Sequence, residues 1–234
     1  MDFVELYLTQ HFKPEIVSET DLSFLRNVEE RIKRKLIVKD GSGYDKIYCD
    51  IGLACVLDEL AETLPNSTVL DIGCGSIKDG LYLISNHNIA EYVGIGENIE
   101  SVWLRIMVEK GYNPRRSETD LYERPTYDVI PKLKVVDADF RAVEPVRKYD
   151  VCLNVGVTSI AEAESKDDLD KLVSHVKSRG RLIYSGNLLA LADETRELIA
   201  HPNISDITEY WVKHENMANS GSNLVSIFQV CTIR

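Results

Sequence analysis

A carboxylate followed by two glycines stands in the stretch Asp71–Gly75, which reads Asp-Ile-Gly-Cys-Gly. The residues from Thr68 to Ile72 are mostly apolar, which is the pattern of a short buried strand. A carboxylate inside such a strand is costly unless it has a partner. The glycines let the backbone approach a ligand closely, and a helix beginning near Ser76 would offer free N–H groups. These residues therefore predict a strand, a tight turn and a helix that together cradle a ligand.

The stretch resembles motif I of the class I (Rossmann-like) S-adenosylmethionine-dependent methyltransferases, in which an acid-x-Gly-x-Gly turn passes under the methionine part of the cofactor. In nicotinamide-binding enzymes the corresponding fingerprint is Gly-x-Gly-x-x-Gly after an uncharged strand. Here Lys78 stands at the third glycine position and the strand carries Asp71, and both differences favour the methyltransferase family. The alternative is an ordinary strand, turn and helix whose glycines serve only the turn.

The family commonly places an acid at the end of its second strand, where it accepts hydrogen bonds from both ribose hydroxyls. The second strand is predicted at Glu91–Ile95, and Gly96 occupies the usual position of the acid. Either Glu97 reaches back to the ribose, or the register is shifted and Glu100 serves. The remaining alternative is that Glu97 is a surface acid that caps the next helix.

Two further strands end in residues that resemble family motifs. The acid-Ala step at Asp137 is similar to the residues that hold the adenine ring, with Asp139 as the alternative in a shifted register. The strand Tyr149–Gly156 resembles motif IV and should place Asn154 at the carboxyl edge of the sheet, where open α/β folds bind ligands. The resemblance implies that S-adenosyl-L-methionine is bound by Asp71, Gly73, Cys74, Gly75, Glu97, Asn98, Asp137, Ala138, Asp139, Asn154 and Val155.

Strands and helices alternate from Thr68 onward, which predicts a parallel sheet with helices on both faces. The resemblance implies a three-layer Rossmann-like α/β fold whose seven-stranded, mostly parallel sheet ends in a C-terminal antiparallel hairpin. The strands are expected at 68–72, 91–95, 134–136, 149–156, 181–184, 207–213 and 224–233. Helices are expected between them at 99–110, 167–177 and 188–200.

The residues before the glycine turn predict helices. Apolar residues recur at helical spacing over 2–12, 21–37 and 50–63. The basic residues from Arg31 to Lys39 are expected on a solvated helix face, and the alternative is a nucleic-acid site. The resemblance implies two domains, a helical cap or lid at 1–48 and the cofactor-binding domain at 49–234.

The segment 112–131 is polar and shows no clear period, so it predicts a long loop that is either functional or disordered. Arg115 and Arg116 within it could meet an anionic substrate. The alternative is a solvated excursion of the chain.

The composition is that of an ordinary globular protein, with 44% hydrophobic and 28% charged residues. The net charge of −11 disfavours binding to a nucleic-acid backbone, and the Asn/Asp-Pro-Pro-aromatic signature of enzymes that methylate base amino groups is absent. The sequence contains no run of about 18 apolar residues that would predict a membrane span. The N-terminus lacks the basic and then apolar segments of a signal peptide, so we expect a cytoplasmic protein. The scattered cysteines indicate neither a zinc site nor a disulfide framework.

The resemblance implies an S-adenosylmethionine-dependent methyltransferase that acts on a small or medium-sized acceptor by in-line transfer. Positioning can supply most of the catalysis of such a step, and no metal is expected. Tyr44, His214 and Glu215 are the candidates for a general base. Two alternatives remain: transfer of the aminocarboxypropyl group of the same cofactor, or a non-catalytic module that binds the cofactor or a partner protein. No pattern points to a particular acceptor atom or oligomeric state.

Overall fold

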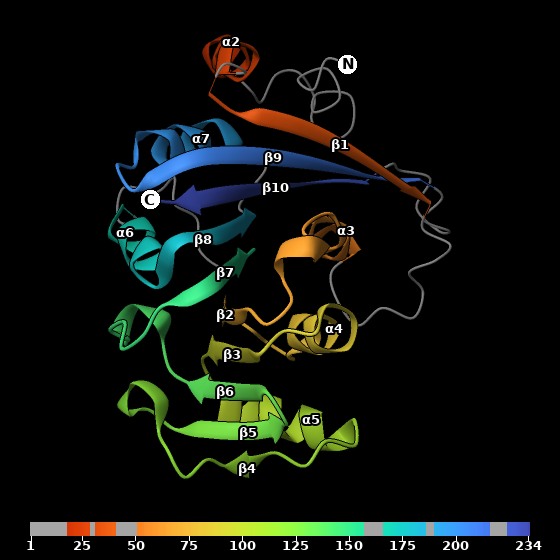
Figure 1. Ribbon diagram of the computed structural model, residues 1–234, viewed down its shortest axis with the longest axis vertical. Coiled ribbons are helices and arrows are strands. Elements are labelled where there is room, and N and C mark those ends of the chain that lie inside the picture. The colour runs from red at the N-terminus through yellow and green to blue at the C-terminus, as the bar shows by residue number, and fades with distance from the viewer. Residues whose placement is uncertain (1–17, 29–30, 41–50, 157–165, 186–189, 216–223) are drawn as a thin grey trace.

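The computed structural model describes residues 18–28, 31–40, 51–156, 166–185, 190–215 and 224–234. Their strands form one mixed sheet that runs through the whole molecule (Figure 1). The strands are β1 (Lys33–Asp40), β2 (Thr68–Ile72), β3 (Glu91–Gly96), β4 (Arg115–Arg116), β5 (Thr126–Ile130), β6 (Leu133–Asp137), β7 (Tyr149–Val155), β8 (Val176–Ser185), β9 (Ile204–Glu215) and β10 (Leu224–Ile233).

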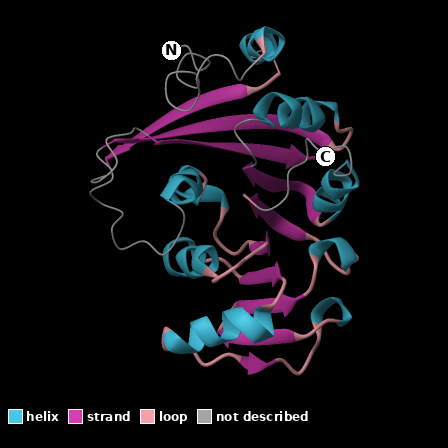
Figure 2. Ribbon diagram, turned by 180° about the vertical axis from the view of Figure 1, so that it is seen from behind, coloured by secondary structure: helices cyan, strands magenta, loops and turns pink. Residues whose placement is uncertain are grey.

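Helices cover both faces of this sheet, as the two opposite views show (Figures 1 and 2). One face carries α3 (Ile51–Glu59), α4 (Lys78–His87) and α5 (Leu104–Glu109). The other carries α6 (Lys166–Ser174) and α7 (Leu191–Ala200), and α2 (Glu19–Asn27) packs on α7. Short helical turns are η3 (Ala61–Thr63), the π-helical η4 (Ile99–Trp103), η5 (Leu121–Glu123) and η6 (Phe140–Ala142). The fold is therefore the predicted three-layer α/β sandwich.

The sheet has ten strands, in the order β1-β9-β10-β8-β7-β2-β3-β6-β5-β4. The five central strands, from β8 to β6, are parallel, and β10 runs antiparallel to both of its neighbours. Each of the predicted strands is present, and the C-terminal hairpin is confirmed as β9 and β10. The predicted number of seven is wrong, because β1 extends one edge of the sheet and β4 and β5 extend the other.

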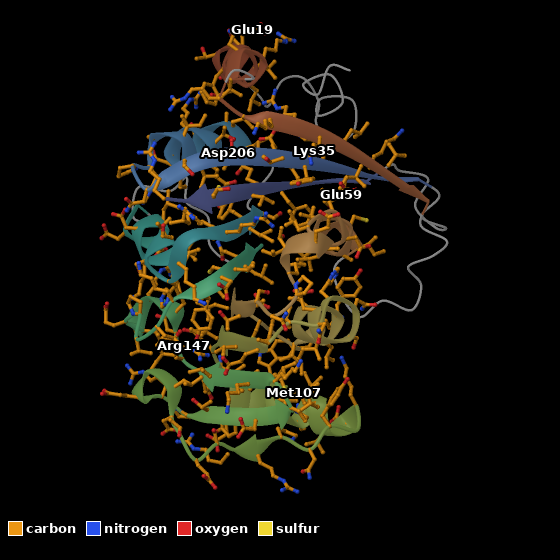
Figure 3. All side chains as sticks on the ribbon, viewed as in Figure 1. Glu19, Lys35, Glu59, Met107, Arg147 and Asp206 are labelled. Carbon is orange, nitrogen blue, oxygen red and sulfur yellow. The ribbon has the colours of Figure 1, made fainter. Side chains whose placement is uncertain are left out.

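The helix predicted from Asp21 to Ile37 is wrong after Asn27. There α2 ends, and the following residues form β1, which pairs in parallel with β9. Most of the basic residues predicted for a helix face therefore lie on an edge strand. There Arg34 points inward, and Lys35, labelled in Figure 3, lies 5.3 Å from the Tyr210 ring centroid. Pairing with a strand distant in sequence overrides the local periodicity here.

The long loop predicted at 112–131 is also wrong in part. It contains β4 and β5, which pair antiparallel with each other, and β5 pairs antiparallel with β6. The strand β5 buries Thr126, Tyr127 and Val129. These are residue types that suit a half-buried sheet, but polar neighbours on both sides conceal the pattern.

One other predicted helix ends at a different residue, and two further predictions concern residues outside the described ranges. The helix predicted at 167–177 ends at Ser174, because β8 begins at Val176 and is longer than predicted. The helix predicted at 2–12 lies outside the described residues, as does much of the proposed cap. The division into a cap at 1–48 and a domain at 49–234 therefore stays a prediction.

Candidate functional site

The carboxyl ends of β2, β3, β6 and β7 lie along one edge of the sheet. Strand β2 pairs in parallel with β3 on one side and with β7 on the other. The chain passes from β2 to β3 and β6 before it returns to β7. The ends of β2 and β7 therefore form a topological switch point, which is where open α/β sheets bind ligands.

The glycine turn after β2 has the backbone geometry that its sequence predicts. Gly73 and Gly75 have φ values of 73° and 46°, in the left-handed region that favours glycine. The N–H groups of Gly73 and Cys74 donate to the Ile95 carbonyl of the neighbouring strand, at 2.8 and 3.2 Å. The turn is thereby fixed to the end of β3 before α4 begins at Lys78.

A cavity of about 250 Å³ opens at the carboxyl ends of β2, β3 and β6. It combines backbone of the glycine turn with polar side chains from the loops that follow β3 and β6. Its volume is below the 300–1,000 Å³ of typical ligand pockets, so it suits one part of a cofactor. Its apolar walls are Ile72, Ile95 and Phe140, and its polar side chains are Glu97, Asp139 and Arg141.

Of the two acids considered for the ribose, Glu97 lines the cavity and Glu100 does not. The backbone N–H of Glu100 donates to Asp137 Oδ2 at 3.0 Å. The side chain of Glu100 hydrogen-bonds with Tyr127, and burial together with this carboxylate raises the pKa of Tyr127. The side chain of Glu100 is therefore directed to β5 and not to the cavity.

The two acids considered for adenine are also placed differently. Asp139 lines the cavity, and its Oδ1 accepts the N–H of Arg141 at 2.8 Å. Asp137 lies beside the cavity and accepts from the first turn after β3. Ala138 lines the cavity as well, while its N–H donates to the Gly96 carbonyl at 3.0 Å. The structure thus brings Asp139 and Ala138 to the cavity.

Asn154 and Val155 lie at the end of β7, across β2 from the cavity. Asn154 is fully buried and pairs in register with Ile72 of β2 and Tyr184 of β8. The Tyr184 hydroxyl donates to the buried Glu194 of α7 at 2.7 Å. The match to motif IV is therefore at the switch point, next to a buried polar pair and outside the cavity.

Sequence reasoning missed the partner of the buried Asp71 carboxylate. Its Oδ2 accepts a hydrogen bond from the hydroxyl of Tyr92 on β3. Both side chains are buried beneath the glycine turn. A tyrosine inside an otherwise apolar strand next to that of Asp71 is the signal that could have found it, because a buried hydroxyl needs a partner.

The other predicted residues contribute less to the site. Tyr44 lies outside the described residues, and so do the side chains of His214 and Glu215, whose backbone belongs to β9. Asn98 is exposed and has a left-handed backbone with φ of 60°. Cys74 is buried, as are Cys55, Cys152 and Cys231.

In the described ranges of the chain, no three side chains of the metal-binding types His, Cys, Asp and Glu gather in a way that could hold a metal ion. None of the helices in these ranges is both long enough and apolar enough to cross a membrane.

No family model matches the chain, and a search of curated proteins finds no match. Solved structures do match. A precorrin-6y C5,15-methyltransferase from Geobacter metallireducens is 14% identical with a TM-score of 0.55, covering 81% of this chain and 91% of that one. A precorrin-8w decarboxylase from Methanobacterium thermoautotrophicum is 19% identical with a TM-score of 0.51, over 79% and 90%. The N-methyltransferase NodS from Bradyrhizobium japonicum is 10% identical with a TM-score of 0.52, over 82% and 99%. The chain therefore has the Rossmann-like α/β fold that these three structures share.

Proposed function

We propose that this chain is an S-adenosylmethionine-dependent methyltransferase that acts on a small or medium-sized acceptor. The observation that carries the proposal is the cavity at the ends of β2, β3 and β6, where the Gly73 turn meets the carboxylates of Glu97 and Asp139. An adenosine group carries hydroxyl and amino donors that carboxylates accept, and a glycine turn admits a ligand close to the backbone. The residues present therefore fit the cofactor.

The cavity residues suggest a division of roles toward the cofactor. Glu97 would accept hydrogen bonds from the ribose hydroxyls, and Asp139 would accept from the adenine amino group, because these two acids line the cavity. The backbone of the Gly73 turn would pass under the methionine part. When bound, the cofactor supplies a methyl group activated by the positive sulfur to which it is attached.

The chain contributes positioning and exclusion of water. An in-line transfer needs the acceptor atom held opposite the leaving sulfur, and correct orientation can supply most of the rate enhancement. The acceptor would approach from the β7 and β8 side of the turn, where Asn154 and Tyr184 pair in register. The net charge of −11 supports a small acceptor and disfavours a nucleic acid. The matched structures are named as a precorrin-6y C5,15-methyltransferase and an N-methyltransferase, so the fold alone does not identify the acceptor.

Calorimetry of cofactor binding with the Gly73→Val variant tests the proposal. Gly73 lines the cavity, so we expect an added side chain to compete with the ligand for space and abolish affinity for S-adenosylmethionine while the protein remains folded. Gly111→Val is the matched control. This glycine also has a positive φ, of 90°, and apart from its chain neighbours no described residue has an atom within 4 Å of where its Cβ would be. Both variants share the backbone strain, so loss of binding in Gly73→Val alone supports the cavity, and unchanged affinity contradicts it.

The reaction is tested by incubating the protein and cofactor with pools of small molecules and measuring product masses. A gain of one methyl group supports the proposal. A gain of an aminocarboxypropyl group supports the alternative transfer. Tight cofactor binding without any product identifies a non-catalytic module.

A further inference from the structure

A buried carboxyl–phenol pair lies directly beneath the glycine turn. The hydroxyl of Tyr92 donates to Asp71 Oδ2, and the two side chains are 0% and 3% exposed. They come from neighbouring parallel strands and point to the same face of the sheet, since Tyr92 is in register with Val69 and Asp71 with Gly94. The pair therefore stands between the sheet and the turn that would carry the cofactor.

Two glycines leave space here, Gly80 for the ring of Tyr92 and Gly94 for Cys74 of the turn. A Cβ at Gly80, in the first turn of α4, would lie 2.7 Å from Tyr92 Cε1. A Cβ at Gly94 would lie 2.5 Å from Cys74 Cβ. The ring of Tyr92 is thus held between α4 and the sheet, and Cys74 of the turn rests on Gly94. The position of the turn and the position of the phenol are set together.

The surroundings of Asp71 are acidic. Burial and the Asp79 carboxylate raise its pKa well above the usual value, and the hydrogen bond from Tyr92 lowers it in part. Four titratable groups face one another here: Asp71 from β2, Tyr92 from β3, Cys74 from the turn and Asp79 from α4. Burial also raises the pKa values of Tyr92 and Cys74 well above their usual values, so both are neutral near pH 7. The groups that act on Asp71 in the described part of the chain include no cation.

A cation brought to the turn would therefore change the ionisation of Asp71. Charges interact strongly where the effective dielectric constant is low, over distances of several ångströms and without direct contact. S-adenosylmethionine carries a sulfonium and an ammonium group. We propose that Tyr92 is a positioning residue that holds Asp71 beneath the turn, so that cofactor binding is coupled to loss of the proton from those molecules in which Asp71 is protonated.

This coupling rests on the proposed function. Its single proton passes from Asp71 to solvent, as follows. Before binding, a fraction of the molecules holds a neutral Asp71 carboxyl, which accepts from Tyr92 through Oδ2. On binding, that carboxyl loses its proton to solvent, the carboxylate keeps the hydrogen bond from Tyr92, and the new negative charge faces the cationic ligand. No bond to carbon changes and no other reactant is needed.

Titration calorimetry with S-adenosylmethionine, in pairs of buffers with different ionisation enthalpies between about pH 5 and 8, measures the protons released. The wild-type protein should release a fraction of one proton that depends on pH. Asp71→Asn should bind more weakly, because it lacks the carboxylate that faces the cationic ligand, and at saturating ligand it should show none of this release. Tyr92→Phe should bind about tenfold more weakly, a loss of about 1.4 kcal/mol, and should show the release at higher pH, because the pKa of Asp71 rises when the phenol is removed.

Tyr82→Phe is the matched control. It removes a similar hydrogen bond, from Tyr82 of α4 to Asp58 Oδ1 at 2.7 Å, away from the turn. It should leave affinity and proton release unchanged. Binding by the wild type with no proton release, or equal release by wild type and Asp71→Asn, overturns the inference and leaves the proposed function standing. Absence of any binding by the wild type overturns both. Asp71→Asn decides the question even if Tyr92→Phe fails to fold.

Discussion

Arg34 Nε of β1 lies 2.8 Å from Glu209 Oε1 of β9, and the two side chains are only 3% and 0% exposed. The same carboxylate accepts from Trp211 Nε1 at 2.8 Å and from Gln229 Nε2 at 3.2 Å. Burial of an ion pair carries a desolvation cost that further hydrogen bonds must offset. Trp211 and Gln229 supply these hydrogen bonds. Together with Arg34 they connect the edge strand β1 to the interior of the sheet.

Arg34→Met should therefore lower the free energy of unfolding by about 3–5 kcal/mol, because it leaves the buried Glu209 charge without its cation. Lys33→Met is the control on the same strand. Lys33 pairs with Asp206 at 3.5 Å, but the side chains are 74% and 48% exposed, so its loss should cost less than about 1 kcal/mol. Denaturant unfolding measures both, and similar values for the two variants would contradict the role given to the buried pair.

His175 should make the protein less stable in mild acid. Its ring is buried against Tyr122 and Phe140, and its two nitrogens have no hydrogen-bond partner among the described residues. Burial, with Lys171 nearby, lowers its pKa from 6.5 to about 4. The unfolded chain takes up the proton first, so the contribution is complete above pH 6.5 and falls as the pH drops toward 4.

The total loss from His175 should approach about 3 kcal/mol, since each pKa unit is worth about 1.4 kcal/mol. His175→Phe should remove this part of the pH dependence between pH 6.5 and 4. Unfolding curves at several pH values compare the two proteins. Parallel curves would show that His175 is not the group responsible.

Gly80→Ala should destabilise the protein although alanine is the better helix former by about 1 kcal/mol. The added methyl group would lie 2.7–2.8 Å from the ring of Tyr92, in a space that cannot widen without moving the ring. We expect a net loss of about 1–3 kcal/mol, typical of overpacking. Ser85→Ala, at an exposed position of the same helix, should change stability by less than about 0.5 kcal/mol. A stabilised Gly80→Ala protein would show that the ring is not confined.

Glu97→Ala should weaken binding of S-adenosylmethionine at least about tenfold, because charge-assisted hydrogen bonds contribute about 1.5–3 kcal/mol each. Glu100→Ala is the control, since its carboxylate interacts with Tyr127 away from the cavity. Calorimetry at constant pH gives both affinities. A loss confined to Glu100→Ala would assign the ribose to the shifted register.

The local part of the fold was predictable because its signals are local. The strand β2 has the predicted bounds of Thr68–Ile72, and the glycines mark the turn because their left-handed backbone leaves few alternatives. The alternation of strands and helices identified the fold class for the same reason. Nothing beyond neighbouring residues was needed for either.

The parts that failed depend on partners far away in the sequence. The sequence around Arg34 predicts a helix face. Only the contact with Glu209 of β9 shows that these residues form a strand. Asp71 showed that a partner was needed, but Tyr92 could be identified only when β2 and β3 were in register. The choice between Asp137 and Asp139 likewise depends on which of them the first turn after β3 engages, and the sequence does not show that contact.

The pairing of β1 with β9 also has a consequence for the order of folding. Arg34 and Glu209 are 175 residues apart, so β1 leaves the ribosome long before its partner strand is made. At synthesis rates of 5–20 residues per second the interval is roughly 10–35 s. During that interval the central parallel strands can assemble, while β1 remains unpaired with its basic side chains exposed to solvent. The edge strand that comes first in the sequence is therefore among the last to join the sheet.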